Sequence, residues 1–244
     1  MKEYPLFING KISAIIHKPK LKQPFVVFCH GFKGNKLGSY NLYVTMAREL
    51  AKQGIGSVRF DFQGSGDSAG KFEDISIKQE LNDLDAICKY IRRQGYCSSV
   101  ALLGHSLGGT VAALYAAKCQ LPAVLLAPAV DRSKALDRYR AEDRVKEVKG
   151  FYIVDGWRVN KKFLTDSLEL YSTAHEIKSA VLLIQGTLDK SCSFEDSQKF
   201  FSGLAGRKKW ITLEGSDHLF SNPSHREQII REATKWLKSA FSAR

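Results

Sequence analysis

The sequence has no long hydrophobic run. No apolar stretch approaches the roughly 18 residues that a membrane-spanning helix needs, so we expect no membrane span. Residues 1–11 also lack the apolar segment of a secretory signal peptide. We therefore expect a cytoplasmic protein.

Cysteine is sparse and irregularly placed. The five cysteines are odd in number and show no C-x-x-C spacing, which argues against a disulfide framework and against a zinc site. They are Cys29, Cys88, Cys97, Cys119 and Cys192, and buried reduced thiols are the expected state. The HExxH, EF-hand and phosphate-loop motifs are also missing, so we expect no metal and no cofactor.

Acidic residues are outnumbered by basic ones. Asp and Glu total 25 against 37 Lys and Arg, which gives a formal net charge of +12. Such an excess can reflect affinity for nucleic acid, for an anionic surface or for acidic substrates. Because the basic residues are spread along the chain and no nucleic-acid motif accompanies them, we favour a solvated basic surface and expect no nucleic-acid partner.

Strand and helix patterns alternate along most of the chain. Residues 3–17 read as a hairpin around Asn9-Gly10, a dipeptide that suits a two-residue turn. Apolar strands are predicted at 25–30, 57–62, 99–104, 123–127, 181–184 and 210–213, and helices at 40–53, 76–94, 107–118, 195–204 and 225–241. This order predicts an α/β fold with a mostly parallel, doubly wound sheet and an N-terminal antiparallel hairpin. The core should comprise residues 1–130 and 177–244.

The alternation breaks between residues 131 and 176, where a charged segment precedes a predicted hairpin around Asp155-Gly156. This insertion follows a strand's carboxyl end, so it should form a small cap on the face where ligands bind in such sheets. Its apolar anchors are Phe151, Tyr152, Trp157 and Phe163. We expect some of them to bind substrate, and the alternative for each is packing within the cap.

The motif Gly104-His105-Ser106-Leu107-Gly108 lies between an apolar strand and a run of small, helix-compatible residues. This context is typical of a nucleophile elbow, in which a serine occupies a tight strand-to-helix turn flanked by glycines. A plain glycine-rich turn is the alternative. We predict that Ser106 is a nucleophile.

A base and an acid follow later strands. His218 follows the strand at 210–213 and Asp189 the strand at 181–184, which gives the chain order Ser, Asp, His of a hydrolase triad. His218 would take the serine proton, and Asp189 would orient the imidazole. Asp131 is a rival for the acid and Asp217 a weaker one.

Backbone N–H groups should complete the site. In this architecture the oxyanion donors are the residue after the serine and one in an earlier loop, here Leu107 and Phe32. We expect His30 and His105 to serve as structural hydrogen-bonding residues beside the site. The other histidines, at 17, 175 and 225, should lie at the surface or at a helix start.

Five segments together resemble the serine esterases of the α/β-hydrolase superfamily, with the closest likeness to the bacterial cinnamoyl (feruloyl) esterases. They are residues 30–35, 59–72, 104–109, 185–189 and 215–218. The resemblance covers roughly 1–130 and 177–244. It implies an α/β-hydrolase fold, a triad of Ser106, Asp189 and His218, and oxyanion donors at Phe32 and Leu107. Leu107 and Ser65 stand where those esterases often carry Gln and His.

The function predicted from these features is hydrolysis of small carboxylic esters through an acyl-enzyme. A thioesterase or acyl-peptide hydrolase would use the same triad. A non-catalytic binding protein on the same scaffold is the alternative from another class. We expect a small-molecule ester as substrate and a monomer or homodimer.

Overall fold

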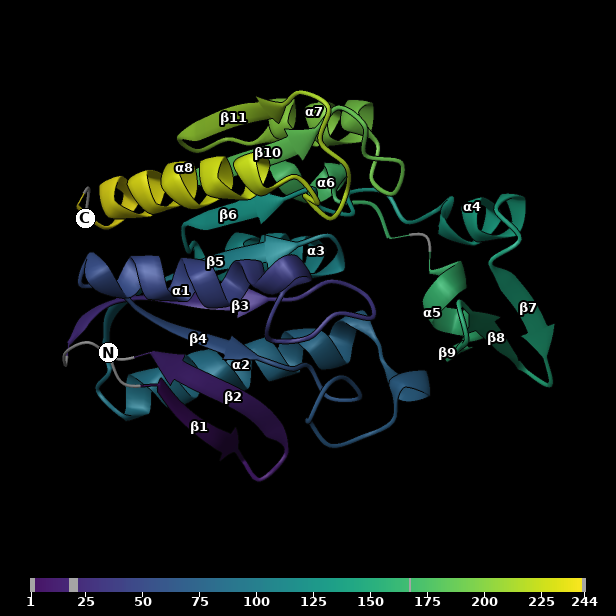
Figure 1. Cartoon of the computed structure of the whole chain (residues 1–244), viewed down its shortest axis with the longest axis horizontal. Coiled ribbons are helices and arrows are strands. Elements are labelled where there is room, and N and C mark those ends of the chain that lie inside the picture. Colours follow the sequence, from purple (N-terminus) through teal and green to yellow (C-terminus); the bar gives the residue numbers. More distant parts are fainter. Residues whose placement is uncertain (1–2, 18–21, 167, 243–244) are drawn as a thin grey trace.

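The computed structural model describes residues 3–17, 22–166 and 168–242. Figure 1 shows a core in which helices cover a central sheet, and a smaller unit, here called the cap, to one side of it. We define the cap as residues 131–169. No helix within the described residues has the length and apolar character needed to cross a membrane.

The central sheet has eight strands and is mostly parallel. Strand β1 pairs with β2, and β2 with β4, in antiparallel fashion, whereas the remaining pairs are parallel. In spatial order the strands are β1 (Glu3–Ile8), β2 (Ile12–His17), β4 (Gly56–Phe60), β3 (Gln23–Cys29), β5 (Cys97–His105), β6 (Ala123–Leu126), β10 (Val181–Gly186) and β11 (Lys208–Leu213). The predicted sheet and its N-terminal hairpin are confirmed, and both hairpin turn residues, Asn9 and Gly10, have positive φ.

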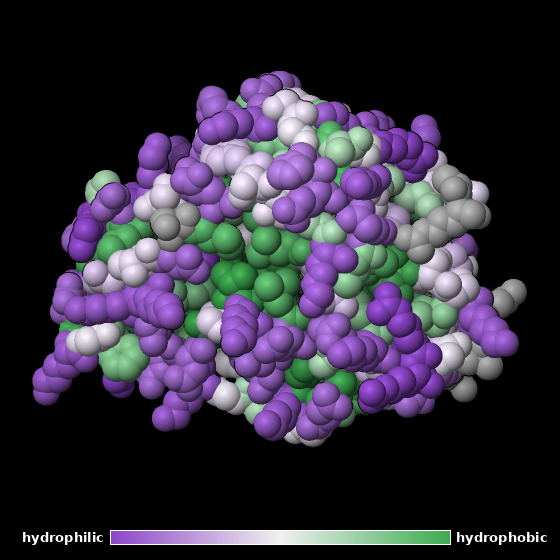
Figure 2. Space-filling model, turned by 180° about the vertical axis from the view of Figure 1, so that it is seen from behind, coloured by the Kyte–Doolittle hydropathy of each residue, from purple (hydrophilic) through white to green (hydrophobic). Residues whose placement is uncertain are grey.

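Helices cover both faces of the sheet because alternate residues of each strand point to opposite faces. In β3, Val26 and Phe28 pack in one apolar cluster with α1 (Leu42–Lys52) and α8 (Pro223–Ser242). Phe25 and Val27 pack in a second cluster with α2 (Ile77–Arg93), α3 (Leu107–Cys119) and α7 (Phe194–Gly203). Figure 2 shows the rear of the molecule, where hydrophilic side chains surround one central hydrophobic area.

The cap contains its own small sheet. Its elements are α4 (Ala135–Ala141), β7 (Val145–Val148), β8 (Phe151–Val154), β9 (Trp157–Asn160) and α5 (Lys161–Thr165). The hairpin of β8 and β9 turns at Asp155 and Gly156, both with positive φ, as the dipeptide predicts. Strand β7 was not predicted, because it is short and largely exposed, with Lys146 and Glu147 at its centre.

The chain rejoins the core earlier than the expected boundary at residue 177. Asp131 and Glu169, the first and last residues of the cap, form a β-bridge with each other. Leu170 and Ala174, at the start and end of the short helix α6 (Tyr171–Ala174), already belong to the sheet's main apolar cluster. The insertion is therefore shorter than its charge pattern suggests.

His17 is not at the surface, contrary to expectation. It is the last residue of β2, its side chain is fully buried, and Arg59 Nε donates to its Nε2 at 3.1 Å. Burial and the Arg59 charge lower the pKa of His17 to about 4. A strand-end histidine is therefore accommodated as a neutral hydrogen-bond acceptor.

Candidate active site

Ser106 lies in the tight turn between β5 and α3. Its backbone is at φ 55° and ψ −122°, a conformation that a non-glycine residue adopts only when its surroundings enforce it. A Cβ on Gly104 would lie 2.2 Å from the Gly108 carbonyl oxygen, and one on Gly108 would lie 2.1 Å from the Cys29 oxygen. Both glycines are thus required by close backbone contact, as a nucleophile elbow demands.

Ser106, His218 and Asp189 form a chain of two hydrogen bonds. His218 Nε2 lies 3.0 Å from Ser106 Oγ, and His218 Nδ1 lies 2.8 Å from Asp189 Oδ2. Because Asp189 accepts the Nδ1 proton, Nε2 is free to accept from the serine hydroxyl. The three residues come from loops that follow β5, β10 and β11, which end at the same edge of the sheet.

Asp189 is held as a carboxylate. Burial raises its pKa, but hydrogen bonds from His218 and from the backbone N–H groups of Cys192 and Ser191 outweigh burial and lower the pKa below its ordinary value. Gln185 Nε2 donates a further hydrogen bond of 3.0 Å to Asp189 Oδ2. The carboxylate is therefore charged and fixed in orientation towards the imidazole.

The two rival acids are engaged elsewhere. Asp131 Oδ1 accepts from the Ser133 backbone N–H, and Asp217 Oδ1 accepts from the Ser221 backbone N–H. Neither carboxylate is hydrogen-bonded to His218 within the described residues. The geometry favours Asp189.

Two backbone N–H groups beside Ser106 are candidate donors to an oxyanion. A Cβ on Gly31 would lie 3.0 Å from Ser106 Cβ, which places the Gly31-Phe32 loop against the serine. In the described part of the chain, neither the Phe32 nor the Leu107 amide N–H donates to a protein acceptor. Leu107 is also the first residue of α3, where helix N–H groups lack intrahelical partners.

His30 and His105 hold the loops around the serine, as expected of structural histidines. Phe62 N donates to His30 Nε2 at 3.0 Å, which leaves His30 Nδ1 to donate to the Gly31 oxygen at 2.9 Å. His105 Nε2 donates to the His218 carbonyl oxygen at 2.9 Å. Burial lowers the pKa of both rings, that of His105 to about 3, so both are neutral.

A cavity of about 420 Å³ opens above Ser106, between the core and the cap. Its floor includes Ser106, His218 and the Phe32 loop, and its roof comes from α4 and α5 of the cap. The cap residues on the cavity are Asp131, Arg132, Ala135, Arg138, Tyr139, Arg144, Phe163 and Leu164. A site of this size suits a small organic molecule.

The family model described as serine aminopeptidase, S33, matches residues 22–166 of the chain. This protein belongs to that family. The protein phosphatase methylesterase 1 of Candida albicans is 28% identical over 99 residues, a match that spans 41% of this chain and only 26% of that relative. The uncharacterised protein YfhR of Salmonella typhi is 22% identical over 237 residues, covering 96% of this chain and 77% of YfhR.

Solved structures share the architecture. Est1E from Butyrivibrio proteoclasticus, in its structure with ferulic acid bound, superposes with a TM-score of 0.82 at 20% identity, covering 98% of this chain and 99% of Est1E. At this identity the likeness shows the fold, an α/β hydrolase with an N-terminal antiparallel hairpin.

Of the four cap aromatics expected to bind substrate, Phe163 lines the cavity. Its ring stacks on Phe32 with centroids 5.5 Å apart. The described residues that line the cavity do not include Phe151, Tyr152 or Trp157.

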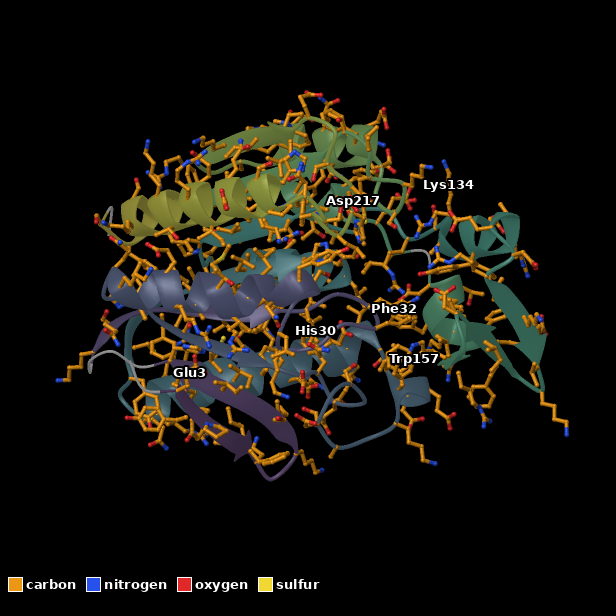
Figure 3. All side chains as sticks on the ribbon, viewed as in Figure 1. Glu3, His30, Phe32, Lys134, Trp157 and Asp217 are labelled. Atoms are coloured by element: carbon orange, nitrogen blue, oxygen red, sulfur yellow. The ribbon has the colours of Figure 1, made fainter. Side chains whose placement is uncertain are left out.

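The three other aromatics have structural contacts, so the expectation that they bind substrate is corrected. Tyr152 is buried in the cap's own apolar cluster, on the inner face of its hairpin. Phe151 lies under the Arg158 guanidinium, 4.0 Å from the ring centroid. Trp157 is 47% exposed and packs on Phe72, which in turn packs on Phe32; Figure 3 shows Phe32 and Trp157 at the junction of core and cap.

Sequence reasoning missed the face of α4. Ala135, Arg138 and Tyr139 all line the cavity, and their i, i+3, i+4 spacing is that of one helix face. The spacing is present in the sequence, but the charged composition around it indicates a segment with few apolar anchors. Arg132 and Arg144, which flank the helix, were missed for the same reason.

One group of potential metal ligands occurs in the described residues. Asp189, Cys192 and His218 offer ligand atoms within 4.8 Å of one another. The facing atoms of Asp189 and His218 are already joined by their hydrogen bond, and burial raises the pKa of the Cys192 thiol well above its usual range. A bound metal would have to replace the contact that orients His218.

Proposed function

We propose that this protein hydrolyses carboxylic esters of small molecules through a covalent acyl-enzyme on Ser106. The observation that carries the proposal is the unbroken hydrogen-bonded series from Ser106 Oγ through His218 to Asp189, beside two N–H groups that have no acceptor among the described residues. A merely structural serine needs neither the strained backbone nor the base behind it.

In the proposed reaction, Ser106 Oγ attacks the ester carbonyl carbon while its proton passes to His218 Nε2. The negative charge that develops on the carbonyl oxygen is stabilised by the N–H groups of Phe32 and Leu107. Collapse of this intermediate breaks the bond to the alcohol oxygen, which takes the proton from His218. Asp189 stabilises the imidazolium while it exists.

Water then completes the cycle. It gives a proton to His218 and attacks the acyl carbon, and the serine leaves with that proton while the acid product departs. Each proton taken by His218 is returned within the cycle, so the reaction needs no cofactor. The neutral rings of His30 and His105 stay out of this transfer, because both nitrogens of His30 and the Nε2 of His105 already bind backbone groups.

The comparisons support ester chemistry over other acyl transfers. One relative is a methylesterase by name, and the solved structure of Est1E contains ferulic acid. The family description names an aminopeptidase, so an amide arm belongs in any test. A hydrolase triad acts on esters, thioesters and amides with the same groups, and the pocket decides among them.

The test is a substrate panel of matched acyl groups presented as a p-nitrophenyl ester, a thioester and an aminoacyl anilide. We expect the ester to give the highest kcat/KM. The Ser106→Ala variant should lose several orders of magnitude in kcat on every substrate, because loss of the nucleophile leaves only binding and the oxyanion donors.

Two results would overturn the proposal. Turnover that survives in Ser106→Ala would place the chemistry elsewhere. A wild-type protein that binds members of the panel without turning any over would indicate a binding protein on a hydrolase scaffold. A thioester or anilide preferred over the ester would reassign the substrate class.

A further inference from the structure

The cavity above Ser106 is rich in positive charge. Four basic side chains line it, and Asp131 is the one acid among the described lining residues. The basic residues are Lys33, Arg132, Arg138 and Arg144. A site that binds a purely apolar ester does not require basic side chains. Whether their positive charge is available to a substrate depends on the carboxylates that pair with each of them.

Two of the four are neutralised by neighbouring carboxylates. Arg144 makes a two-pronged contact with Asp155, at 2.8 Å and 2.6 Å, and a further one with Glu142 at 2.6 Å. Lys33 pairs with the same Asp155 carboxylate. Asp155 thus joins the Phe32 loop of the core to the cap. The charges of Lys33 and Arg144 stabilise this contact.

Arg138 has no such counter-charge. Its Nη1 donates to the carbonyl oxygen of Ser191, and its guanidinium lies 5.6 Å from the Tyr139 ring centroid. In the part of the chain that the structure describes, no carboxylate lies within 4.0 Å of it, although its neighbour on α4, Arg140, pairs with Asp137. Arg138 is half-buried on the cavity wall, so solvent only partly screens its charge.

Arg138 is tied to the loop that carries the candidate acid, because the residue whose carbonyl oxygen it binds, Ser191, donates its backbone N–H to Asp189 Oδ1. Burial and the Asp189 charge raise the pKa of the Cys192 thiol, while the Arg138 charge and a hydrogen bond with Ser106 oppose that rise. Arg138, Cys192 and Ser106 all line the same cavity. Arg138 faces the space that a molecule bound at Ser106 would occupy.

Arg132 adds a second, deeper positive charge. It is only 6% exposed, and its Nη1 is buried without a hydrogen-bond partner in the described residues. Its Nη2 donates to the Phe163 oxygen at 2.7 Å, and the nearest carboxylate oxygen, in Asp166, lies 3.8 Å away. The guanidinium also covers the Phe163 ring at 4.4 Å. This buried cation raises the potential of the cavity and holds the aromatic wall.

We propose that the substrate is an ester carrying a second, anionic group, a carboxylate in the simplest case, that pairs with Arg138. This proposal rests on the ester hydrolysis proposed above and specifies its substrate class. A guanidinium binds a carboxylate through two parallel hydrogen bonds, and such a pair gains strength where the cavity excludes water. The positive charge of Arg138 then serves to bind the substrate, a role that the overall basic character of the protein surface does not explain.

The experiment compares matched ester pairs that differ only in the anionic group. For the acyl side, p-nitrophenyl monoadipate is compared with its methyl-capped neutral form. For the alcohol side, para-carboxyphenyl butyrate is compared with its methyl ester. We expect the anionic member of at least one pair to show a kcat/KM at least about tenfold higher, and raised salt to reduce that preference.

Variants test the assignment to Arg138. Arg138→Gln should lose about tenfold or more on the preferred anionic ester and stay within about twofold on the neutral one. Arg138→Lys should retain part of the preference because it keeps the charge. Arg140→Gln, on the same helix but exposed and paired with Asp137, is the matched control and should leave both substrates unchanged.

The outcomes separate this inference from the function on which it rests. If the neutral esters turn over in a Ser106-dependent way without any anion preference, the charge assignment is wrong and the esterase proposal stands. If Arg138→Gln slows both members of a pair equally, Arg138 only supports the loop at Ser191. If no ester turns over, the proposed function itself fails.

Discussion

The core and the cap are stabilised in different ways. The core has two large apolar clusters, one on each face of the sheet, whose members are almost fully buried. The cap has one small cluster that is completed by Ile75 and Leu107 of the core and by the partly buried Phe32 and Phe72. Its other contacts are ion pairs such as Arg144 with Asp155. The core therefore positions the candidate triad, while the packing of the cap depends on its contacts with the core.

Two carboxylates, one in each region, have pKa values that are shifted in opposite directions. In the core, burial raises the pKa of Glu80 on α2 to about 8, against a smaller opposing effect of Arg132. In the cap, hydrogen bonds from Arg144 and Lys33 lower the pKa of the mostly exposed Asp155. Burial therefore disfavours the charge of Glu80, whereas hydrogen bonds favour the charge of Asp155.

The largest effect is expected where the core supports the chemistry. Asp189→Asn should reduce kcat on the order of 10⁴-fold, because an amide cannot stabilise the imidazolium and favours the wrong tautomer of His218. Steady-state kinetics on the best ester of the panel provide the measurement.

Asp131→Asn is the matched control for this change. Among the described residues, its carboxylate lines the cavity and accepts from the Ser133 backbone N–H but not from His218, so kcat should stay within about tenfold of the wild type. If Asp131→Asn loses most of its kcat and Asp189→Asn keeps it, the acid is misassigned.

A smaller and selective effect is expected in the cap. Phe163→Ala should reduce kcat/KM for a bulky aryl ester by about tenfold and spare a short acetyl ester, because the ring forms part of the cavity wall and supplies no reacting group. Trp157→Ala removes a larger aromatic ring of the cap that is not among the described residues lining the cavity, so both esters should be unaffected.

Phe163 is nearly buried, so folding must be followed in parallel. Phe163→Leu keeps most of the packing, and it should show the same selectivity in weaker form with little change in melting temperature. Equal losses on both esters that track a lower melting temperature would mean that Phe163 only holds the cap together.

The smallest effect concerns stability in the core. Glu80 binds its proton more tightly in the folded protein, so its contribution to stability is present below pH 4.5 and is lost as the pH rises to about 8. Glu80→Gln should therefore leave the melting temperature nearly unchanged at pH 4 and raise it by several degrees (about 2–4 °C per kcal/mol for a chain of this size) at pH 9.

Calorimetry across this pH range, with Glu214→Gln as the control, checks the sign. Glu214 is exposed after β11, so its replacement should change the melting temperature little. A Glu80→Gln variant that loses stability at pH 9 would mean that the charged carboxylate pairs favourably with Arg132.

Much of the core and its site could be predicted from the sequence. Strands buried on both faces appear as continuous apolar runs, and the glycines around Ser106 are required by local contacts that any chain of this fold must satisfy. The elbow, His218 and Asp189 each follow a strand, so their meeting at one edge of the sheet follows from topology.

The cap could be predicted only in part. The turn at Asp155-Gly156 depends on local backbone preference and was found, whereas β7 and the cavity face of α4 depend on contacts with the core. Aromatic content did not indicate which rings face Ser106, because strand alternation and the core residues beneath decide it. His17 was misjudged for a related reason, since Arg59 lies 42 residues away in sequence.

The central claim is that Ser106 is a nucleophile activated by His218. A fluorophosphonate probe tests it directly, because the probe traps an activated serine whatever the natural substrate is. Mass spectrometry of the labelled protein should find one adduct, on Ser106, and none in Ser106→Ala. An adduct on another residue, or labelling that persists in the variant, would contradict the account.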